Sequence, residues 1–270
     1  TTSRSTSGST ATRRNGADND IYVMDPVDSR KDKMVLSVNG GGWGIADWSH
    51  DEAQLLLIEY ISITKSRIHL LDLKTGARRQ LTPDLAEEVS YAGAKFASDD
   101  RSFFTVSDRG SEFNRLMEFP LPAPGAFIDQ PRRNLSADIQ WDVEDFEPTS
   151  NGRRLAFIAN ENGISVLRVV DLKSGKRLRL PVLPTGVISN LRWRENGRDL
   201  GFNLSSARSP LDVYSIDVEK RRLDRWTQSE TGGTNPSQFV EPELVTFKSF
   251  DGLPISAFVL PITKIFLVHD

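Results

Sequence analysis

The sequence contains no cysteine, only three histidines, and no apolar run long enough to cross a membrane as a helix. The absence of cysteine excludes a disulfide framework, a thiolate metal site and a cysteine nucleophile. Lysine and arginine (34) nearly balance aspartate and glutamate (37), and the net charge of -3 lacks the positive field that nucleic-acid binding requires. We therefore expect a soluble protein, periplasmic or cytoplasmic, with neither a nucleic-acid nor a membrane partner.

The residues needed for hydrolytic or metal chemistry are also scarce. No G-x-S-x-G segment occurs, and the closest string, residues 163–167, lacks the final glycine and lies in a predicted strand. His50 falls in a turn, His69 alternates with apolar residues in a strand, and His269 is one residue from the end. Because a serine hydrolase needs a serine, an imidazole and a carboxylate together, we predict no catalytic residue in this chain. We likewise predict no metal site and no cofactor.

What the sequence does contain is a repeat. A strand-like segment that ends in aspartate occurs four times, at residues 21–25, 68–72, 167–171 and 213–217. The four aspartates are 47, 99 and 46 residues apart, so one copy of a period near 49 is missing. Residues 116–121 occupy that position, with Pro120 in place of the aspartate. A fixed period of this length is typical of a repeat architecture.

A second marker has the same phase. A polar turn precedes a short apolar strand at residues 49–52, 98–101, 150–153 and 195–198. The central residues of these turns, Asp51, Asp99, Asn151 and Asn196, are 48, 52 and 45 residues apart. Each unit contains four short strand patterns and no helical period, which favours a β-propeller over a β-sandwich with coincidental spacing.

The fold class we predict is therefore all-β, with a partial propeller of about four and a half four-stranded blades. Residues 1–19 are expected to form a tail and the cut edge of a blade. The propeller spans 20–238, with blades at 20–42, 43–88, 89–140, 141–186 and 187–233.

Several segments resemble bacterial members of the prolyl oligopeptidase family of serine peptidases, from about Arg13 to Leu260. They are residues 20–26, 40–43, 47–49, 59–62, 205–210, 230–233 and, most specifically, 239–252. The last of these resembles the passage from the propeller into the α/β-hydrolase domain, with an Asp-Gly hairpin turn at Asp251-Gly252. The resemblance implies that residues 239–270 are a linker and the start of a truncated hydrolase domain.

The resemblance also implies a function. The family's triad lies beyond the point that Asp270 reaches, and its propeller has seven or eight blades. We therefore expect a fragment truncated at both ends and inactive alone, whose parent enzyme hydrolyses short peptides. Its partners would be the peptide substrate and the hydrolase domain of that enzyme. The alternative is a free-standing propeller that binds a protein or peptide; the strand pair at 239–260 favours the fragment, because a free-standing propeller has no use for it.

The repeat indicates where substrate-gating residues would lie. In every blade the loop between the second and third strands must emerge on one face of the propeller, and the resemblance implies that one face covers the hydrolase active site. The candidates on these loops are Arg208 and Glu59, which could contact the carboxylate or amine of a peptide, and Arg109 and Glu112. We predict that Arg208→Ala changes the Michaelis constant for charged peptides.

Overall fold

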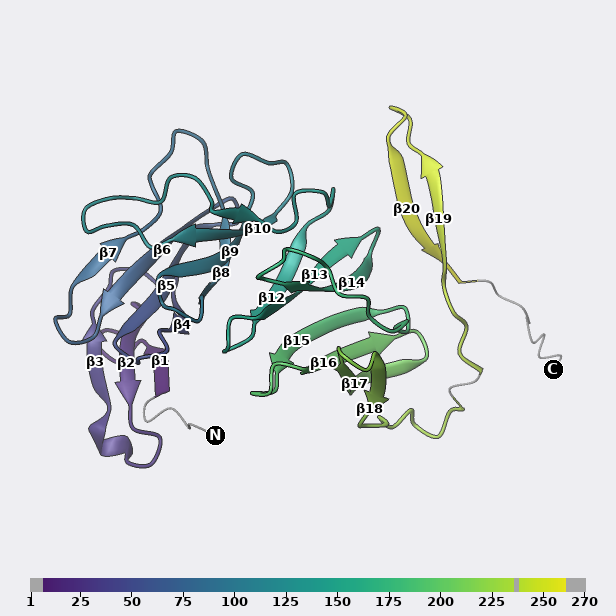
Figure 1. Ribbon diagram of the computed structural model, residues 1–270, viewed down its shortest axis with the longest axis horizontal. Coiled ribbons are helices and arrows are strands. Elements are labelled where there is room, and N and C mark those ends of the chain that lie inside the picture. Colours follow the sequence, from purple (N-terminus) through teal and green to yellow (C-terminus); the bar gives the residue numbers. More distant parts are fainter. Residues whose placement is uncertain (1–6, 236–237, 261–270) are drawn as a thin grey trace.

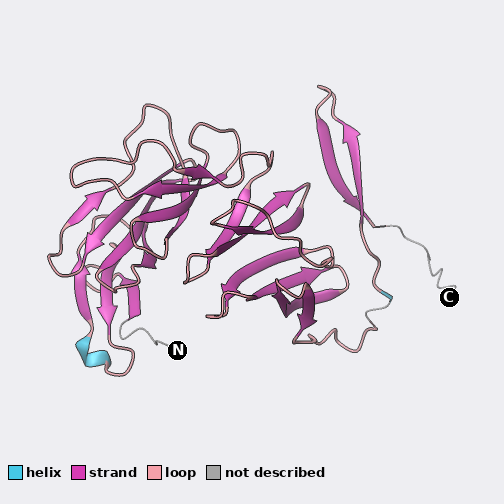
Figure 2. Cartoon of the chain, in the orientation of Figure 1, coloured by secondary structure: helices cyan, strands magenta, loops and turns pink. Residues whose placement is uncertain are grey.

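The computed structural model describes residues 7–235 and 238–260, and the regular secondary structure of this part is almost entirely antiparallel strands (Figures 1 and 2). The first sheet contains β1 (Ser7–Ala11), β2 (Asp20–Met24) and β3 (Lys33–Leu36), with the short 3-10 helix η1 (Ser29–Lys31) before β3. The second sheet contains β4 (Trp43–Trp48), β5 (Gln54–Ser62), β6 (Lys65–Asp72) and β7 (Arg78–Gln80). No helix of this part is long and apolar enough to span a membrane.

Three further sheets of the same kind follow. The third contains β8 (Tyr91–Phe96), β9 (Ser102–Ser107), β10 (Arg115–Pro120) and β11 (Arg133–Asn134), and the fourth contains β12 (Val143–Pro148), β13 (Arg154–Glu161) and β14 (Ile164–Asp171). The fifth contains β15 (Val187–Trp193), β16 (Asp199–Ser206), β17 (Ser209–Asp217) and β18 (Arg222–Arg225). A separate hairpin, β19 (Glu243–Lys248) and β20 (Pro254–Val259), ends the described chain. The expected all-β class and propeller fold are confirmed.

The sheets pack face to face along an arc, so that each central sheet is buried on both sides (Figure 1). The consecutive residues Phe103 and Phe104 of β9 illustrate the cause. Side chains alternate between the two faces of a strand, so Phe103 packs with residues of the second sheet and Phe104 with residues of the fourth. Because successive side chains of β9 are apolar, both faces of this strand are buried between neighbouring sheets.

The turns between first and second strands show why the second sequence marker repeats. The side chains of Asp51, Asp99, Asn151 and Asn196 each accept a hydrogen bond, at 3.0 Å, from the backbone N–H two residues later. The next residue has positive φ in all four turns, at Glu52, Asp100, Gly152 and Gly197. The marker is thus the Asx turn that reverses the chain within each sheet.

The aspartates that end the repeated strand segments likewise form turns. Their turns connect the third and fourth strands, at the same end of the sheet as the Asx turns. Asp72 accepts hydrogen bonds from the N–H and hydroxyl of Thr75, both at 2.8 Å, and Asp171 does the same with Ser174. The backbone N–H donors hold the pKa of both carboxyls below its ordinary value, because they stabilise the ionised form. The repeated aspartate is therefore a turn-forming residue of the fold.

The structure adds two local details that the sequence pattern did not specify. Residues 7–11, expected within a tail and cut blade edge, form β1, which pairs with β2 from Ser7↔Met24 to Ala11↔Asp20. This segment has no alternating apolar pattern, and its pairing with β2 supplies the hydrogen bonds that make it a strand. The fourth sheet has three strands, with a single bridge between Val170 and Arg177 at the position of a fourth.

Candidate functional site at the loop face

The antiparallel order of each sheet divides the connections between two faces. The connection from second to third strand lies at one end of the sheet, which we call the loop face, and includes residues 63–64, 108–114, 162–163 and 207–208. The turns from first to second and from third to fourth strand lie at the opposite end, which we call the turn face.

The hairpin β19–β20 lies on the loop face side (Figure 1). Ser256 of β20 donates a hydrogen bond to the side chain of Asn162 at 2.6 Å, and the Phe258 ring lies against Gly163. These two contacts join the hairpin to the loop between β13 and β14. The chain that leaves the fifth sheet therefore returns to the loop face of the fourth.

Of the predicted gating residues, Arg208 contacts the segment that leads to the hairpin. Its Nε lies 2.9 Å from Glu241 Oε1, and both side chains are about half exposed. The loop between β16 and β17 thus holds the linker through an ion pair. Arg208 lies on the predicted face, and its partner in the structure is Glu241.

Glu59 belongs to a partly buried network of the second sheet. Its Oε2 lies 2.9 Å from Nε2 of His69 and 3.4 Å from Arg67. His69 is buried against the Trp43 ring, with ring centroids 4.7 Å apart, and burial lowers its pKa even though Glu59 opposes this shift. Glu59 therefore lies within β5 and not on the loop where the sequence predicted it, and it pairs with a buried imidazole of its own sheet.

Arg109 and Glu112 occupy the loop between β9 and β10. The Arg109 guanidinium lies 5.9 Å from the centroid of the Phe119 ring and donates to the carbonyl of Ile128 at 3.5 Å. Glu112 is exposed on the same loop. Both residues lie on the loop face, at its third sheet, while Arg208 and its linker partner are at the fifth.

A buried aspartate, which was not among the predicted site residues, holds the segment that leaves the fifth sheet. Asp212 is fully buried and accepts hydrogen bonds from Thr227 Oγ1 (2.7 Å), Ser229 N (2.9 Å), Arg225 Nη2 (2.5 Å) and the Ser209 hydroxyl. Burial alone would raise the pKa of Asp212, but these donors outweigh it and hold that pKa far below its ordinary value. Because the donors lie up to 17 residues away in the sequence, no local sequence pattern indicates this network.

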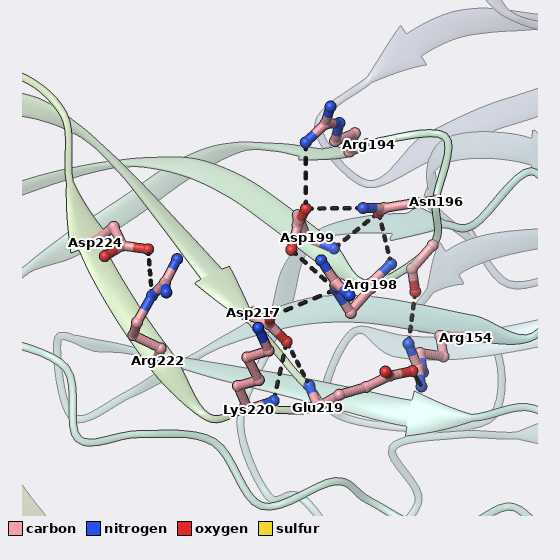
Figure 3. Close-up of polar contacts among 11 residues, drawn as sticks. Arg154, Arg194, Asn196, Arg198, Asp199, Asp217, Glu219, Lys220, Arg222 and Asp224 are labelled. Carbon is pink, nitrogen blue, oxygen red and sulfur yellow. Dashed lines mark hydrogen bonds and ion pairs between the residues drawn. The ribbon is translucent and has the colours of Figure 1, made fainter.

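The turn face carries a second set of polar contacts, between the fourth and fifth sheets (Figure 3). Arg154, at the start of β13, is buried; it donates to the Gly197 carbonyl at 2.7 Å and lies 2.8 Å from Glu219. Asp217 accepts from Glu219 N and Lys220 N and lies 3.4 Å from Arg198. The contacts of Arg154 fasten the fourth sheet to the fifth, and those of Asp217 hold a turn of the fifth sheet, so both sets are structural.

The hairpin has little cover from the rest of the described chain. Every residue of β19 is exposed, as are four of the six in β20. Its exposed apolar side chains are Leu244, Val245, Phe247, Phe250, Leu253, Ile255, Phe258 and Val259. The hairpin therefore presents apolar side chains that the rest of the described chain leaves uncovered.

The repeated four-stranded sheets and their face-to-face arc place this chain among the β-propellers. A family model described as the prolyl oligopeptidase N-terminal beta-propeller domain matches residues 27–229, and the chain belongs to this family. No curated protein sequence matches the chain.

Solved structures show the same fold. The chain is similar to a puromycin hydrolase (TM-score 0.72, 19% identity, 92% of this chain and 39% of that one). It is also similar to a structure from a study of two prolyl endopeptidases (TM-score 0.67, 20% identity, 88% and 34%). A third is prolyl oligopeptidase B from Galerina marginata (TM-score 0.69, 15% identity, 94% and 36%). The chain thus spans little more than a third of each of these proteins.

Proposed function

We propose that this chain is the propeller portion of a serine peptidase that hydrolyses short peptides, serving as scaffold and substrate gate for a hydrolase domain. The observation that carries the proposal is the exposed apolar hairpin on the loop face. An isolated two-stranded hairpin is marginally stable in water and needs a further packing partner. A hydrolase domain that begins with β19 and β20 would supply that partner.

The contacts of the hairpin support this assignment of the faces. Arg208 and Asn162 tie the linker and β20 to loops of two sheets, so a domain that grows from the hairpin would lie over the loop face. The gating candidates Arg208, Arg109 and Glu112 would then face that domain, whereas Glu59 lies within β5 and pairs with His69. A peptide would reach the active site between the two domains or through the centre of the propeller.

In this proposal the chain alone is inactive, because the nucleophile, base and carboxylate belong to the hydrolase domain. A fluorophosphonate probe, which labels activated serines, tests this directly. We expect labelling of a polypeptide that includes the hydrolase domain after β20, and none of the 270-residue chain. Labelling of the chain itself would overturn the assignment.

The same experiment separates the proposal from a free-standing binding propeller. If the longer polypeptide also remains unlabelled and cleaves no short peptide, the peptidase assignment fails and the binding module is favoured. Heat-denatured protein serves as the control for nonspecific labelling.

A further inference from the structure

One charged residue occupies the same repeat position on the first strand of four consecutive sheets. These residues are Asp47, Lys95, Glu147 and Arg192, each four residues before the aspartate or asparagine of the following Asx turn. They are 48, 52 and 45 residues apart, and their charges alternate in sign. We call them the charge belt. The first strand is an edge strand of its sheet. The first strands of neighbouring sheets lie side by side, β4 beside β8 and β12 beside β15. The belt therefore follows the inner side of the arc, where these edge strands meet.

The belt residues contact one another across the sheets. Lys95 forms an ion pair with Glu147, and Arg192 lies 3.2 Å from the same carboxylate. Asp47 accepts a hydrogen bond from the backbone N–H of Phe96 at 2.9 Å, next to Lys95. Burial raises the pKa of Glu147, while Lys95 and Arg192 oppose the shift and Asp47 adds to it. The four charges therefore act on one another across the inner side of the arc.

The position of the belt is on the turn-face side. Asp47, Lys95 and Glu147 line a cavity of about 220 Å³ together with turn residues such as His50 and Ser150. The hairpin lies at the opposite, loop face. A peptide that approaches from the turn face would therefore meet the belt before it reached the side of the hairpin.

We propose that the charge belt makes the entrance to the propeller on the turn face electrically neutral. A substrate gate at this entrance would then admit peptides of either charge. This inference rests on the proposed function and deepens it. Two acidic and two basic side chains sum to zero, and because Glu147 lies next to both Lys95 and Arg192, much of the field they produce cancels within a few ångströms. A mouth with a net charge would instead enrich peptides of the opposite sign.

The proposal predicts opposite effects for two substitutions in the enzyme that includes this chain and its hydrolase domain. The measured quantity is the ratio of kcat/KM for two peptides of equal length that differ only in a Glu or Lys remote from the scissile bond. Glu147→Gln leaves the belt with a net charge of about +1 and should move the ratio about threefold toward the Glu peptide. Lys95→Met should move it about threefold toward the Lys peptide, and both shifts should shrink at 0.5 M salt.

Two controls separate the belt from a merely structural effect. The double variant Lys95→Met/Glu147→Gln removes one charge of each sign, so it keeps the belt neutral and should restore the wild-type ratio. Asp138→Asn changes the net charge equally at an exposed ion pair with Arg177, outside the belt, and should leave the ratio unchanged. Loss of folding would lower both rates without moving their ratio.

The outcomes distinguish the two proposals. If the wild-type enzyme cleaves both peptides but neither single substitution moves the ratio, or both move it in the same direction, the belt proposal is overturned while the peptidase function stands. If the wild-type enzyme cleaves neither peptide, the proposed function itself fails.

Discussion

The guanidinium of Arg208 lies 2.9 Å from the carboxylate of Glu241, an ion pair between a loop of the fifth sheet and the linker to the hairpin. Both side chains are about half exposed, so the pair contributes little to the free energy of unfolding and mainly fixes the course of the linker. This geometry changes how the effect of an Arg208 substitution on peptide binding is interpreted.

We expect Arg208→Ala to change the free energy of unfolding of this chain by less than about 1 kcal/mol. In the enzyme with its hydrolase domain it should raise KM for charged peptides. If the effect passes through the linker, Glu241→Ala should raise KM equally and the double variant should add nothing further. Additive changes in KM would instead place Arg208 in direct contact with the peptide, and an unaltered KM in Arg208→Ala would remove it from the gate.

Gly42, in the connection from the first to the second sheet, lies too close to the backbone of Tyr60 to carry a side chain. A Cβ atom at Gly42 would overlap the backbone carbonyl oxygen of Tyr60, whereas one at Gly44 would meet nothing within 4 Å. We expect Gly42→Ala to lower the free energy of unfolding by about 2 kcal/mol or more, because the obstacle is backbone. Gly44→Ala, two residues away, should change it by less than about 0.5 kcal/mol. Equal effects in urea unfolding would contradict this packing argument.

The Asp212 network should make stability depend on pH. Its pKa in the folded protein is depressed, so its contribution is complete above the ordinary carboxyl pKa of about 3.9 and is lost as pH falls toward the folded value. We expect Asp212→Asn to cost about 2 kcal/mol at pH 7, through the loss of charge-assisted hydrogen bonds, and less at pH 3.

Urea unfolding at the two pH values measures this difference. Asp224→Asn, which removes a partly exposed partner of the exposed Arg222, is the matched control and should have little effect at either pH. A cost for Asp212→Asn that stays constant from pH 7 to pH 3 would refute the role of the ionised carboxylate.

The buried Arg154 offers a test of how the fourth and fifth sheets are joined. Arg154→Met should lower the free energy of unfolding by about 2 kcal/mol, chiefly because the buried Gly197 carbonyl loses its donor. Arg153→Met replaces the exposed neighbouring residue and should change stability by less than about 0.5 kcal/mol. Thermal unfolding followed by circular dichroism compares the two. Equal melting temperatures for the two variants would show that Arg154 does not join the sheets.

Much of the fold follows from the sequence because its signals are local. Asp72 and Asp171 bond to residues three positions later, and Asp51 and Asn196 to residues two positions later, so their spacing reveals the blade period directly. The strand pair around Asp251-Gly252 was predictable for the same reason. β1 was not predicted as a strand because its Ser-Gly-Ser-Thr-Ala segment has no alternation of apolar and polar residues. It becomes a strand through its pairing with β2.

The sequence by itself therefore determined the all-β repeat and its turns, and it suggested which charges to consider as gating candidates. Only the tertiary structure decided what those charges contact. Arg208 pairs with Glu241, 33 positions later, and Glu147 pairs with Lys95 and Arg192 from two other sheets. Such partners depend on how separate sheets pack, and the free energy of an ion pair depends on the distance and burial that packing sets.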